Sequence, residues 1–558
     1  MKKRSVQITV LLALLIMAIA MLAACDSDSG AADTPAPVAD EVVANDTGAA
    51  DTDAEAPPAE LPDGVVTLTA FTNNTAFNTA VWGVDLVSSE IIARTGVNIE
   101  WEVNADDGDT RLNLIVASGD LPDIIDADRN SLAIRTLQQD GSLYSWCTLF
   151  ERYVPGFLDA PFFQRNRTYL QFFEGSDAIY TVPGGFVDRQ AIDSGQHIMQ
   201  ATGYYVNTAI MEALGNPRLE TLDDLEHVLR LAVEYDPTLA NPLFLWNPVD
   251  NGWDASGIQI LHRSMGGRGD HYVAADGSVQ HVVRCPHYRE TLMFVNRLFN
   301  QGLISHNNFT DETLEQEAIN TEGSWAVSLG HLWRAIVPND ALPSGVTAIP
   351  HPVQPGVDYF HPVTALNGWG GYFVTTAVSN PEAAARFLSF MVSDEGRTLV
   401  LFGIEDEHWE WGGPDNDWVM LIGEGQELMN EGWGAWTEAL GTYRYHAVAY
   451  SSFDSAFVWG LASVDPFRLN LHTVQNVGVD ASEFADINPD AETAEGANHV
   501  RINEILHPLV AQIAMAPSEA EAEALFEELV ASVEASGVEG VEAVWTERVN
   551  ANRVRLGR

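Results

Sequence analysis

Strand-like and helix-like segments alternate in the first folded stretch of this chain, and this alternation limits the fold more than any other feature. Val65–Phe71 is rich in β-branched and apolar residues, and Val97–Val103 alternates apolar with polar residues. The spacing of apolar residues predicts helices over Val84–Thr95 and Thr110–Ser118. A turn at Gly119–Asp123 then leads into a short strand. This order predicts an α/β fold with a mainly parallel sheet.

A second informative stretch is Asn367–Trp411, which reads as a glycine-rich strand followed by two capped helices. Asn380 is a good N-cap, and Pro381 fits the first helical position. The second helix is expected to begin at Ser393 and to end at Gly403. We expect the glycines of the strand to let the backbone flex or lie close to a ligand.

Length and charge exclude several classes of function. A chain of 558 residues is too long for one hydrophobic core, so more than one compact unit is expected. The formal net charge is −51, and lysine occurs only at Lys2 and Lys3. Such a surface argues against nucleic-acid binding and against adhesion to anionic lipid through basic patches. It also repels anionic ligands at long range, although a local arginine cluster could override this effect.

The first 64 residues are predicted to lie outside the folded part. Met1–Cys25 has a basic start and an apolar run, which are typical of a secretory signal. Leu22-Ala23-Ala24-Cys25 is similar to the lipobox of bacterial lipoproteins, which implies cleavage before Cys25 and a lipid on its sulfur. Residues 26–64 are acidic and poor in hydrophobic residues, so we expect a disordered tether. Of the other cysteines, Cys147 and Cys285 could pair, but we expect free thiols.

Motifs for catalysis or metal binding are missing from the sequence. The chain contains no GxSxG, HExxH, CxxC, Walker or dinucleotide-binding pattern. His262, His271, His281 and His287 lack metal-ligand spacing, so we expect scattered surface histidines. Asp106–Asp109 is interpreted as a solvated turn. We therefore predict a protein that is not an enzyme and needs neither cofactor nor metal.

Tryptophan points to a class of ligand instead. Several of the 15 tryptophans stand beside glycine or polar residues, among them Trp253, Trp333 and Trp369. Sugars present apolar C–H faces and polar edges, and their sites combine aromatic platforms with polar hydrogen-bonding groups. Each of these tryptophans could equally be a core residue. His331, two residues before Trp333, is a further candidate.

Polar side chains follow predicted strand ends in the first part of the chain. Asn73 and Asn74 come after the first strand, and Asp126 and Asp128 come at the end of the strand that contains Ile124. Clefts in open α/β sheets form outside the carboxyl ends of strands, so these residues are candidates for binding sugar hydroxyls. Each could also be a turn or helix-capping residue.

Several separated landmarks resemble one family. They are the crossing segment Gly203–Asn207, the strand and loop Gly323–Trp333, the two capped helices after Asn380 and the C-terminal segment Ser536–Arg555. In this order they resemble the extracellular solute-binding lipoproteins of ABC sugar importers. The resemblance implies a two-lobed, type II periplasmic-binding-protein-like fold, each lobe a mainly parallel sheet flanked by helices, with additional C-terminal helices. It also adds Tyr204, at the first crossing, to the candidate ligand residues.

The resemblance sets the expected organisation. Residues 65–202 and 369–420 would form lobe 1, and residues 203–368 and 421–558 would form lobe 2. A carbohydrate would bind between the lobes and be delivered to the permease subunits of the transporter. The protein would be a monomer anchored through Cys25 to the outer face of the cell membrane. Two alternatives stay open: a secreted carbohydrate-active enzyme, and a binding protein for peptides or another small solute.

Overall fold

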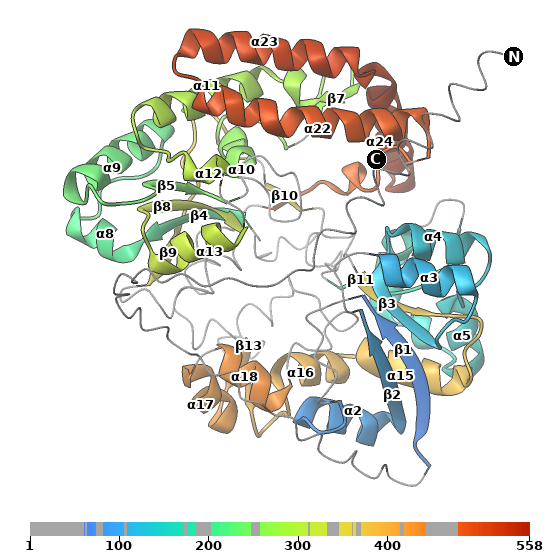
Figure 1. Ribbon diagram of the computed structural model, residues 1–558. Coiled ribbons are helices and arrows are strands. Elements are labelled where there is room, and N and C mark those ends of the chain that lie inside the picture. Colours follow the sequence, from blue (N-terminus) through green and yellow to red (C-terminus); the bar gives the residue numbers. More distant parts are fainter. Residues whose placement is uncertain are drawn as a thin grey trace, which may run out of the picture. The chain divides into compact units, whose positions relative to one another are not determined.

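The computed structural model of the chain (Figure 1) describes most of the region after residue 60. The described residues are 61, 64–73, 82–104, 109–171, 176–184, 202–246, 257–269, 271–310, 313–331, 345–359, 361–363, 370–412, 418–431, 433–441, 478–490 and 492–558. The predicted signal, tether and Cys25 lie outside these residues. No helix within the described ranges is long and apolar enough to cross a membrane.

The first sheet has four strands in the order β11-β3-β1-β2. These strands are β1 (Val66–Thr72), β2 (Val97–Val103), β3 (Ile124–Asp128) and β11 (Gly370–Val374). β1 pairs in parallel with both β2 and β3, as the alternation of strands and helices predicts. β11 joins the edge in the antiparallel direction, with Gly370 opposite Asp128. The stretch after Asn367 therefore returns the chain to its first sheet.

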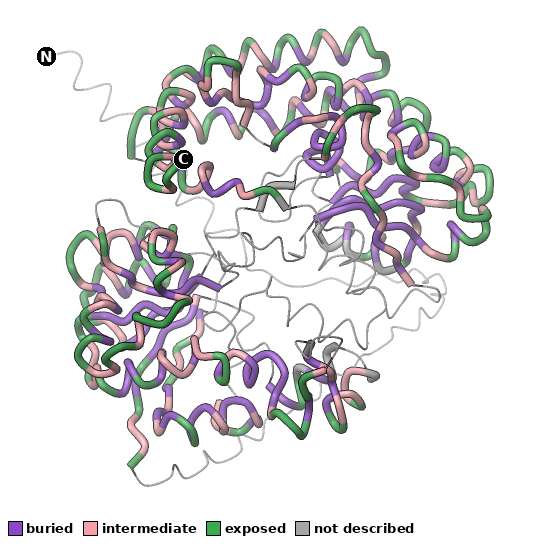
Figure 2. Tube along the Cα trace, turned by 180° about the vertical axis from the view of Figure 1, so that it is seen from behind, coloured by how far each residue is buried: buried purple, intermediate pink, exposed green. Residues whose placement is uncertain are grey.

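Helices cover both faces of this sheet. They are α2 (Leu86–Thr95), α3 (Thr110–Ser118), α4 (Leu132–Gln139), α5 (Trp146–Tyr153), α6 (Pro161–Leu170), α15 (Pro381–Met391) and α16 (Asp394–Phe402), with the 3-10 turn η2 (Phe157–Asp159). Two apolar clusters result, and we call them together the first core. One contains Leu68, Ile91 and Phe387, and the other contains Phe71, Ile125 and Phe373. β3 and β11 are almost entirely buried, and Figure 2 shows buried strand segments within this sheet.

The second sheet has the order β5-β8-β4-β9 and is mixed. Its strands are β4 (Thr202–Asn207), β5 (Leu243–Leu245), β8 (Val327–His331) and β9 (Val346–Ile349). Only β5 and β8 are parallel, whereas β4 is antiparallel to both β8 and β9. The expectation of a mainly parallel sheet is wrong here, because β4 lies between two strands that run in the opposite direction.

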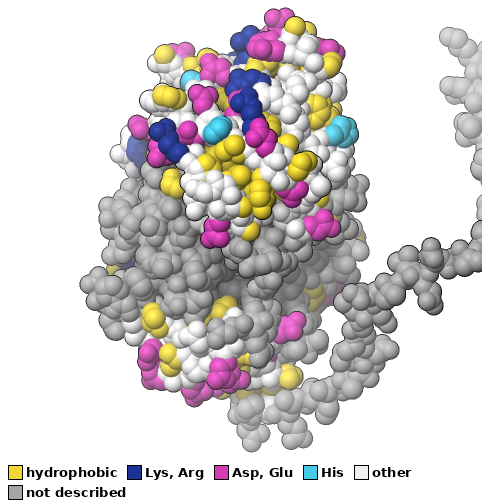
Figure 3. Space-filling model, turned by 90° about the vertical axis from the view of Figure 1, so that its left-hand side faces the viewer, with side chains coloured by type: hydrophobic (Ala, Val, Ile, Leu, Met, Phe, Trp, Pro, Cys, Tyr) yellow, Lys and Arg dark blue, Asp and Glu magenta, His cyan; other side chains and the backbone are white. Residues whose placement is uncertain are grey.

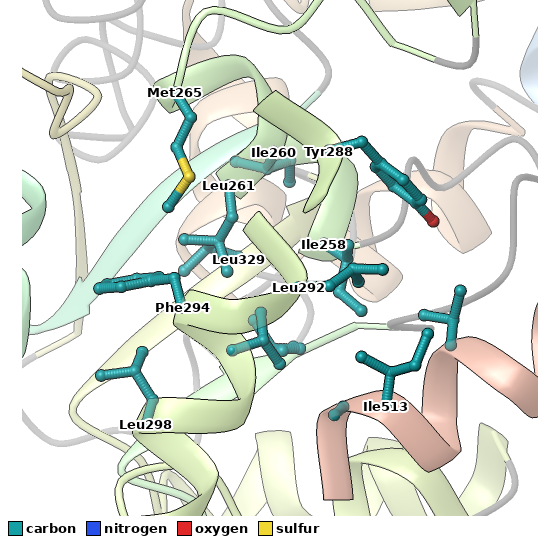
Figure 4. Packing of buried hydrophobic residues seen from close by; sticks show 14 of the residues in the cluster. Ile258, Ile260, Leu261, Met265, Tyr288, Leu292, Phe294, Leu298, Leu329 and Ile513 are labelled. Carbon is teal, nitrogen blue, oxygen red and sulfur yellow. The ribbon is translucent and has the colours of Figure 1, made fainter. Parts of the chain in front are cut away.

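The C-terminal helices complete the core that includes residues of the second sheet. α22 (Ala494–Met515), α23 (Glu519–Ala535) and α24 (Val538–Arg555) contribute apolar side chains to one large cluster, which we call the second core. α8 (Thr208–Ala213), α9 (Leu222–Tyr235), α10 (Gly257–Ser264) and α11 (Pro286–Asn300) add further residues. Figure 4 shows Ile513 of α22 near Leu292 of α11 and Ile258 of α10. α22 and α23 run side by side in Figure 1.

Shorter elements complete the described chain. They are α12 (Asn307–Thr310), α13 (Thr313–Glu322), α17 (Gly423–Glu431), α18 (Trp433–Leu440), β6 (His271–Val273), β7 (Val279–His281), β10 (His361–Val363), β12 (Trp409–Gly412), β13 (Trp418–Leu421), β14 (Gly478–Asp480), η3 (Val282–Arg284) and η5 (Ser482–Phe484). The α/β class is confirmed. The assignment of two lobes with the boundaries given above stays a prediction.

The helix N-caps that the sequence predicts are present in the structure. The Asn380 side chain accepts a hydrogen bond from the amide of Ala383, and Pro381 opens α15. Thr221 and Asp224 bond each other's backbone in a capping box at the start of α9. Each bond satisfies an amide that the first turn of a helix otherwise leaves without a partner. Local chemistry thus sets these helix starts.

Candidate ligand-binding site

Three of the predicted residues lie together at the carboxyl edge of the first sheet. The amide of Asn73, just after β1, donates to the carbonyl of Asp126 at 2.8 Å. Its side chain lies in a polar chain: Asn104 Nδ2 donates to Asn73 Oδ1, and Asn73 Nδ2 donates to Asp109 Oδ1, both at 2.7 Å. These bonds hold the Asn73 amide in one orientation.

Asp126 is the most deeply buried of the three predicted residues. It is 1% exposed, and Thr72 Oγ1 donates to Asp126 Oδ2 at 2.7 Å. Burial raises the pKa of Asp126 to about 7, because the charged carboxylate loses its hydration, while the bond from Thr72 acts in the opposite direction. Near neutral pH this side chain is therefore divided between a neutral form that can donate a hydrogen bond and a charged form that only accepts.

Asp128 is more accessible and lies among other charges. Burial raises the pKa of Asp128, and the nearby carboxylates of Asp109 and Asp486 add to this effect. The bond from the Asn130 amide and the charge of Arg129 oppose it. Arg129 itself is 2% exposed and contacts Asp486 with both terminal nitrogens, at 3.0 and 3.2 Å. A residue of the C-terminal region thus comes next to the candidate residues of the first sheet.

The other predicted residues are not brought to this edge by the described structure. Tyr204 belongs to the second core; it is fully buried, and its hydroxyl lies 2.8 Å from Ser264 Oγ. His331 ends β8, but its side chain is outside the described part. Asn74, Trp253, Trp333 and Trp369 also lie outside the described residues.

Sequence reasoning missed three polar residues of this edge. Asn104 follows β2 directly, so the rule that selected Asn73 could have selected it as well. Asp109 was placed in a solvated turn, yet it accepts a bond from Asn73. Arg129 follows β3, but its partner Asp486 lies 357 positions away in the sequence. No local sequence pattern predicts an ion pair between residues that are so far apart in the sequence.

The histidines correct a second expectation. His262 and His281 are 1% and 4% exposed, rather than lying at the surface. Burial lowers the pKa of each to about 3, so both are neutral at physiological pH. His281 lies stacked near Trp545 of α24, with ring centroids 6.0 Å apart. These imidazoles are packing residues of the second core.

Cys147 and Cys285 are free thiols, as expected.

The surface of the second core carries ion pairs and a pocket. On the face in Figure 3, basic side chains lie among acidic ones. A pocket of about 330 Å³ lies between α9, α11 and α23, with Met265 and Phe294 among its lining residues. Arg289 and Glu523 line it as well and form an ion pair. Of the candidate ligand residues that the structure describes, none lines this pocket.

The solved structures that share the fold of this chain include solute-binding proteins of ABC transporters for sugars. The chain therefore shares the fold of solute-binding proteins of the kind that its landmarks resemble. No protein-family model matches the chain.

Three of these structures illustrate the match. An HMO-binding, ABC-transporter-associated solute-binding protein from Bifidobacterium longum infantis has a TM-score of 0.62 at 14% identity, over 88% of this chain and 99% of that one. The Streptococcus pneumoniae substrate-binding protein FusA in complex with kestose has a TM-score of 0.63 at 16% identity, with the same coverage. The N-glycan transport protein NgtS of the same species has a TM-score of 0.56 at 13% identity, over 87% of this chain and 99% of that one.

Sequence similarity covers a shorter region. The fructooligosaccharide ABC transporter substrate-binding protein FusA of S. pneumoniae serotype 4 is 24% identical over 235 residues. The match spans 40% of this chain and 42% of that protein. The chain thus matches less than half the length of this curated relative.

Proposed function

We propose that this chain is the substrate-binding component of an ABC transporter and that it captures an oligosaccharide. The observation that carries the proposal is the polar edge formed by Asn73, Asp126 and Asp128 at the carboxyl ends of adjacent strands, in a fold shared with sugar-binding transport proteins. Amide, carboxyl and carboxylate groups together offer donors and acceptors for sugar hydroxyls. No covalent step is required, and the protein acts by binding rather than by catalysis.

The proposed mechanism is closure around the ligand. Residues 65–202 with 369–420 form one lobe, and residues 203–368 with 421–558 form the other. The ligand favours the closed state because only that state lets both lobes contact it. The closed form then docks on the permease subunits. A lipid on Cys25 and the acidic tether 26–64 would hold this monomeric protein at the outer face of the membrane.

A thermal-shift panel tests the ligand class. A ligand that binds only the folded state raises the unfolding midpoint by mass action. We expect oligosaccharides, with kestose and nystose as first probes, to raise the midpoint, and peptides of similar size to leave it unchanged. Sugars recovered after incubation should be intact. A shift with peptides alone, or cleavage of the sugar, would contradict the proposal.

Substitutions at the polar edge test the site. Asp128→Ala and Asn73→Ala should weaken sugar binding about tenfold each, because each removes a hydrogen-bonding group from a partly dry site. Asp120→Ala, at an exposed position after α3, is the matched control. Isothermal titration with the sugar found in the panel measures the change. Unchanged affinity in both variants would place the site elsewhere.

A further inference from the structure

Arg263 is a buried cation that has no carboxylate partner among the residues that the structure describes. It lies near the end of α10 and is 7% exposed. Its Nε atom makes no hydrogen bond. Within the described ranges, no Asp or Glu forms an ion pair with it, whereas Arg230 and Arg284 each contact a carboxylate of Glu226 or Glu542. A charge that is removed from water and left unpaired costs several kcal/mol, so its retention calls for an explanation.

The rings around this guanidinium do not neutralise it. His351 stacks on Tyr359 with centroids 3.8 Å apart and planes at 9°. Burial raises the pKa of Tyr359 to about 12, and the charge of Arg263 and its side-chain hydrogen bond to Tyr359 only partly oppose this. Burial, followed by the charge of Arg263, lowers the pKa of His351 to about 3. Both rings are therefore neutral near pH 7 and leave the positive charge in place.

Arg263 lies near one end of the second sheet. The backbone of Thr202, the first residue of β4, bonds His351. Thr202 pairs with His331, the last residue of β8 and a predicted ligand residue. The turn after α10 also passes close by, since a Cβ on Gly269, whose φ is +107°, would lie 4.0 Å from Arg263 Nη2. The guanidinium thus sits beside a glycine turn, near the strand end that carries His331.

We propose that Arg263 anchors an anionic group of the ligand, so that the captured oligosaccharide carries carboxylate or sulfate groups. This inference rests on the proposed function and specifies its substrate class. The planar guanidinium binds such oxyanions through two parallel hydrogen bonds, which a neutral sugar cannot offer. The net charge of −51 repels an acidic sugar at long range, so binding requires a strong local cation.

The first test measures stability without ligand. Arg263→Met keeps much of the apolar stem and removes the unneutralised charge, so the midpoint of thermal unfolding should be equal to or higher than that of the natural protein. An arginine with a purely structural role would lose stability on this change. Arg218→Met, at a side chain that is 63% exposed, is the control. A fall in the midpoint clearly larger than that of the control would overturn the inference.

The second test measures binding. Oligomers of galacturonate, glucuronate and mannuronate are titrated beside their neutral, carboxyl-reduced forms, and inorganic sulfate at matched ionic strength serves as the smallest probe. The natural protein should prefer an acidic oligomer by about 30-fold or more, the size expected for one buried charge pair. Arg263→Met should abolish this preference and the sulfate-induced rise in midpoint, Arg263→Lys should keep part of both, and Arg218→Met should keep all.

The outcomes separate this inference from the proposed function. Neutral sugars that bind equally well to the natural protein and to Arg263→Met would uphold the proposed function and overturn the anion site. A sulfate effect that depends on Arg263 without binding of any sugar would refute the proposed function and the acidic-sugar assignment together. A preference for acidic oligomers that persists in Arg263→Met would also overturn the role of Arg263.

Discussion

For Asp126, the sequence predicts the position at a strand end but not the burial of the side chain. Its position at a strand end is visible in the sequence and marks it as a candidate for hydrogen bonding. Its burial is not visible, because it depends on β1 and β11, which pair on either side of β3. The burial decides whether the carboxyl group donates or accepts, and therefore which hydroxyl of a sugar it can contact.

The raised pKa of Asp126 predicts a pH dependence of stability. Its folded pKa of about 7 lies above the ordinary aspartate pKa of 3.8, so its contribution is favourable below about pH 4 and is lost as the pH rises through 7. Asp126→Asn should therefore be more stable than the natural protein at pH 8, by about 4 kcal/mol at most, and similar to it at pH 4. Urea unfolding at both pH values measures this difference. An equal difference at both pH values would contradict the assignment.

Gly370 and Gly371 form a matched pair for a second prediction. Neither glycine has a positive φ, so the backbone conformation requires glycine at neither position. A Cβ on Gly371 would lie 2.3 Å from Oγ1 of the buried Thr181, whereas the nearest atom to a Cβ on Gly370 is the Ala127 oxygen at 3.5 Å. Gly371→Ala should cost about 1–3 kcal/mol of stability through overpacking.

Gly370→Ala is the control for this change and should stay within about 0.5 kcal/mol. Chemical denaturation of both variants measures the two losses. Equal losses of stability would show that the strand as a whole, rather than the contact with Thr181, requires glycine at position 371. Close packing against Thr181 thus gives Gly371 a structural reason in addition to the backbone flexibility that the sequence predicts.

At the scale of elements, local signals predict helix starts well and strand directions poorly. Asn380 and Ser393 cap α15 and α16 through bonds within four residues, so the sequence contains the whole interaction. The direction of β4 depends on β8 and β9, which begin more than 100 residues later in the chain. Such long-range pairing depends on the packing of the whole core, so the sequence of a single strand does not predict its direction.

The contact between α11 and the end of α22 supports a prediction about one side chain. Asn296 is 1% exposed, and its Nδ2 donates to the carbonyls of Ile513, Ala514 and Ala516 at 3.1, 3.2 and 2.7 Å. A helix C-terminus leaves such carbonyls without partners. Asn296→Ala should cost about 2–3 kcal/mol, because these buried acceptors lose a donor.

Asn550→Ala, at an exposed position of α24, should change stability by less than about 0.5 kcal/mol and serves as the control. Hydrogen exchange of α22 should also become faster in Asn296→Ala. If the two variants had equal stability, Asn296 would not be holding the helix end.

At the scale of the whole molecule, polar contacts join the two cores. Arg129 follows β3 of the first sheet, and Asp486 lies beside Ile487 of the second core. The Arg548 side chain donates to the Asp486 carbonyl, and Asp486 has a φ of +54°, which Asn also tolerates. The sequence predicts two compact units, but it does not reveal which charges connect them.

Asp486→Asn should lower the stability by about 2 kcal/mol, because Arg129 is almost fully buried and loses the charge opposite it. The partial exposure of Asp486 reduces the loss below that of a fully buried pair. Combining this change with Arg129→Met should cost less than the sum of the two single changes. The exposed pair Arg218 and Asp224 is the control and should show coupling below about 1 kcal/mol. Strict additivity at Arg129 and Asp486 would contradict the pairing.

The way each core is assembled also determines when the chain can fold during synthesis. The first sheet cannot be completed until β11 has been synthesised. The second core cannot be completed until α22 and α24 have been synthesised. At the usual rate of elongation, an early strand such as β3 remains without its last partner for about ten seconds or more. Contacts this distant in sequence also form slowly, because loop closure must precede them. A ribosome-bound chain that ends before α22 should therefore remain sensitive to protease.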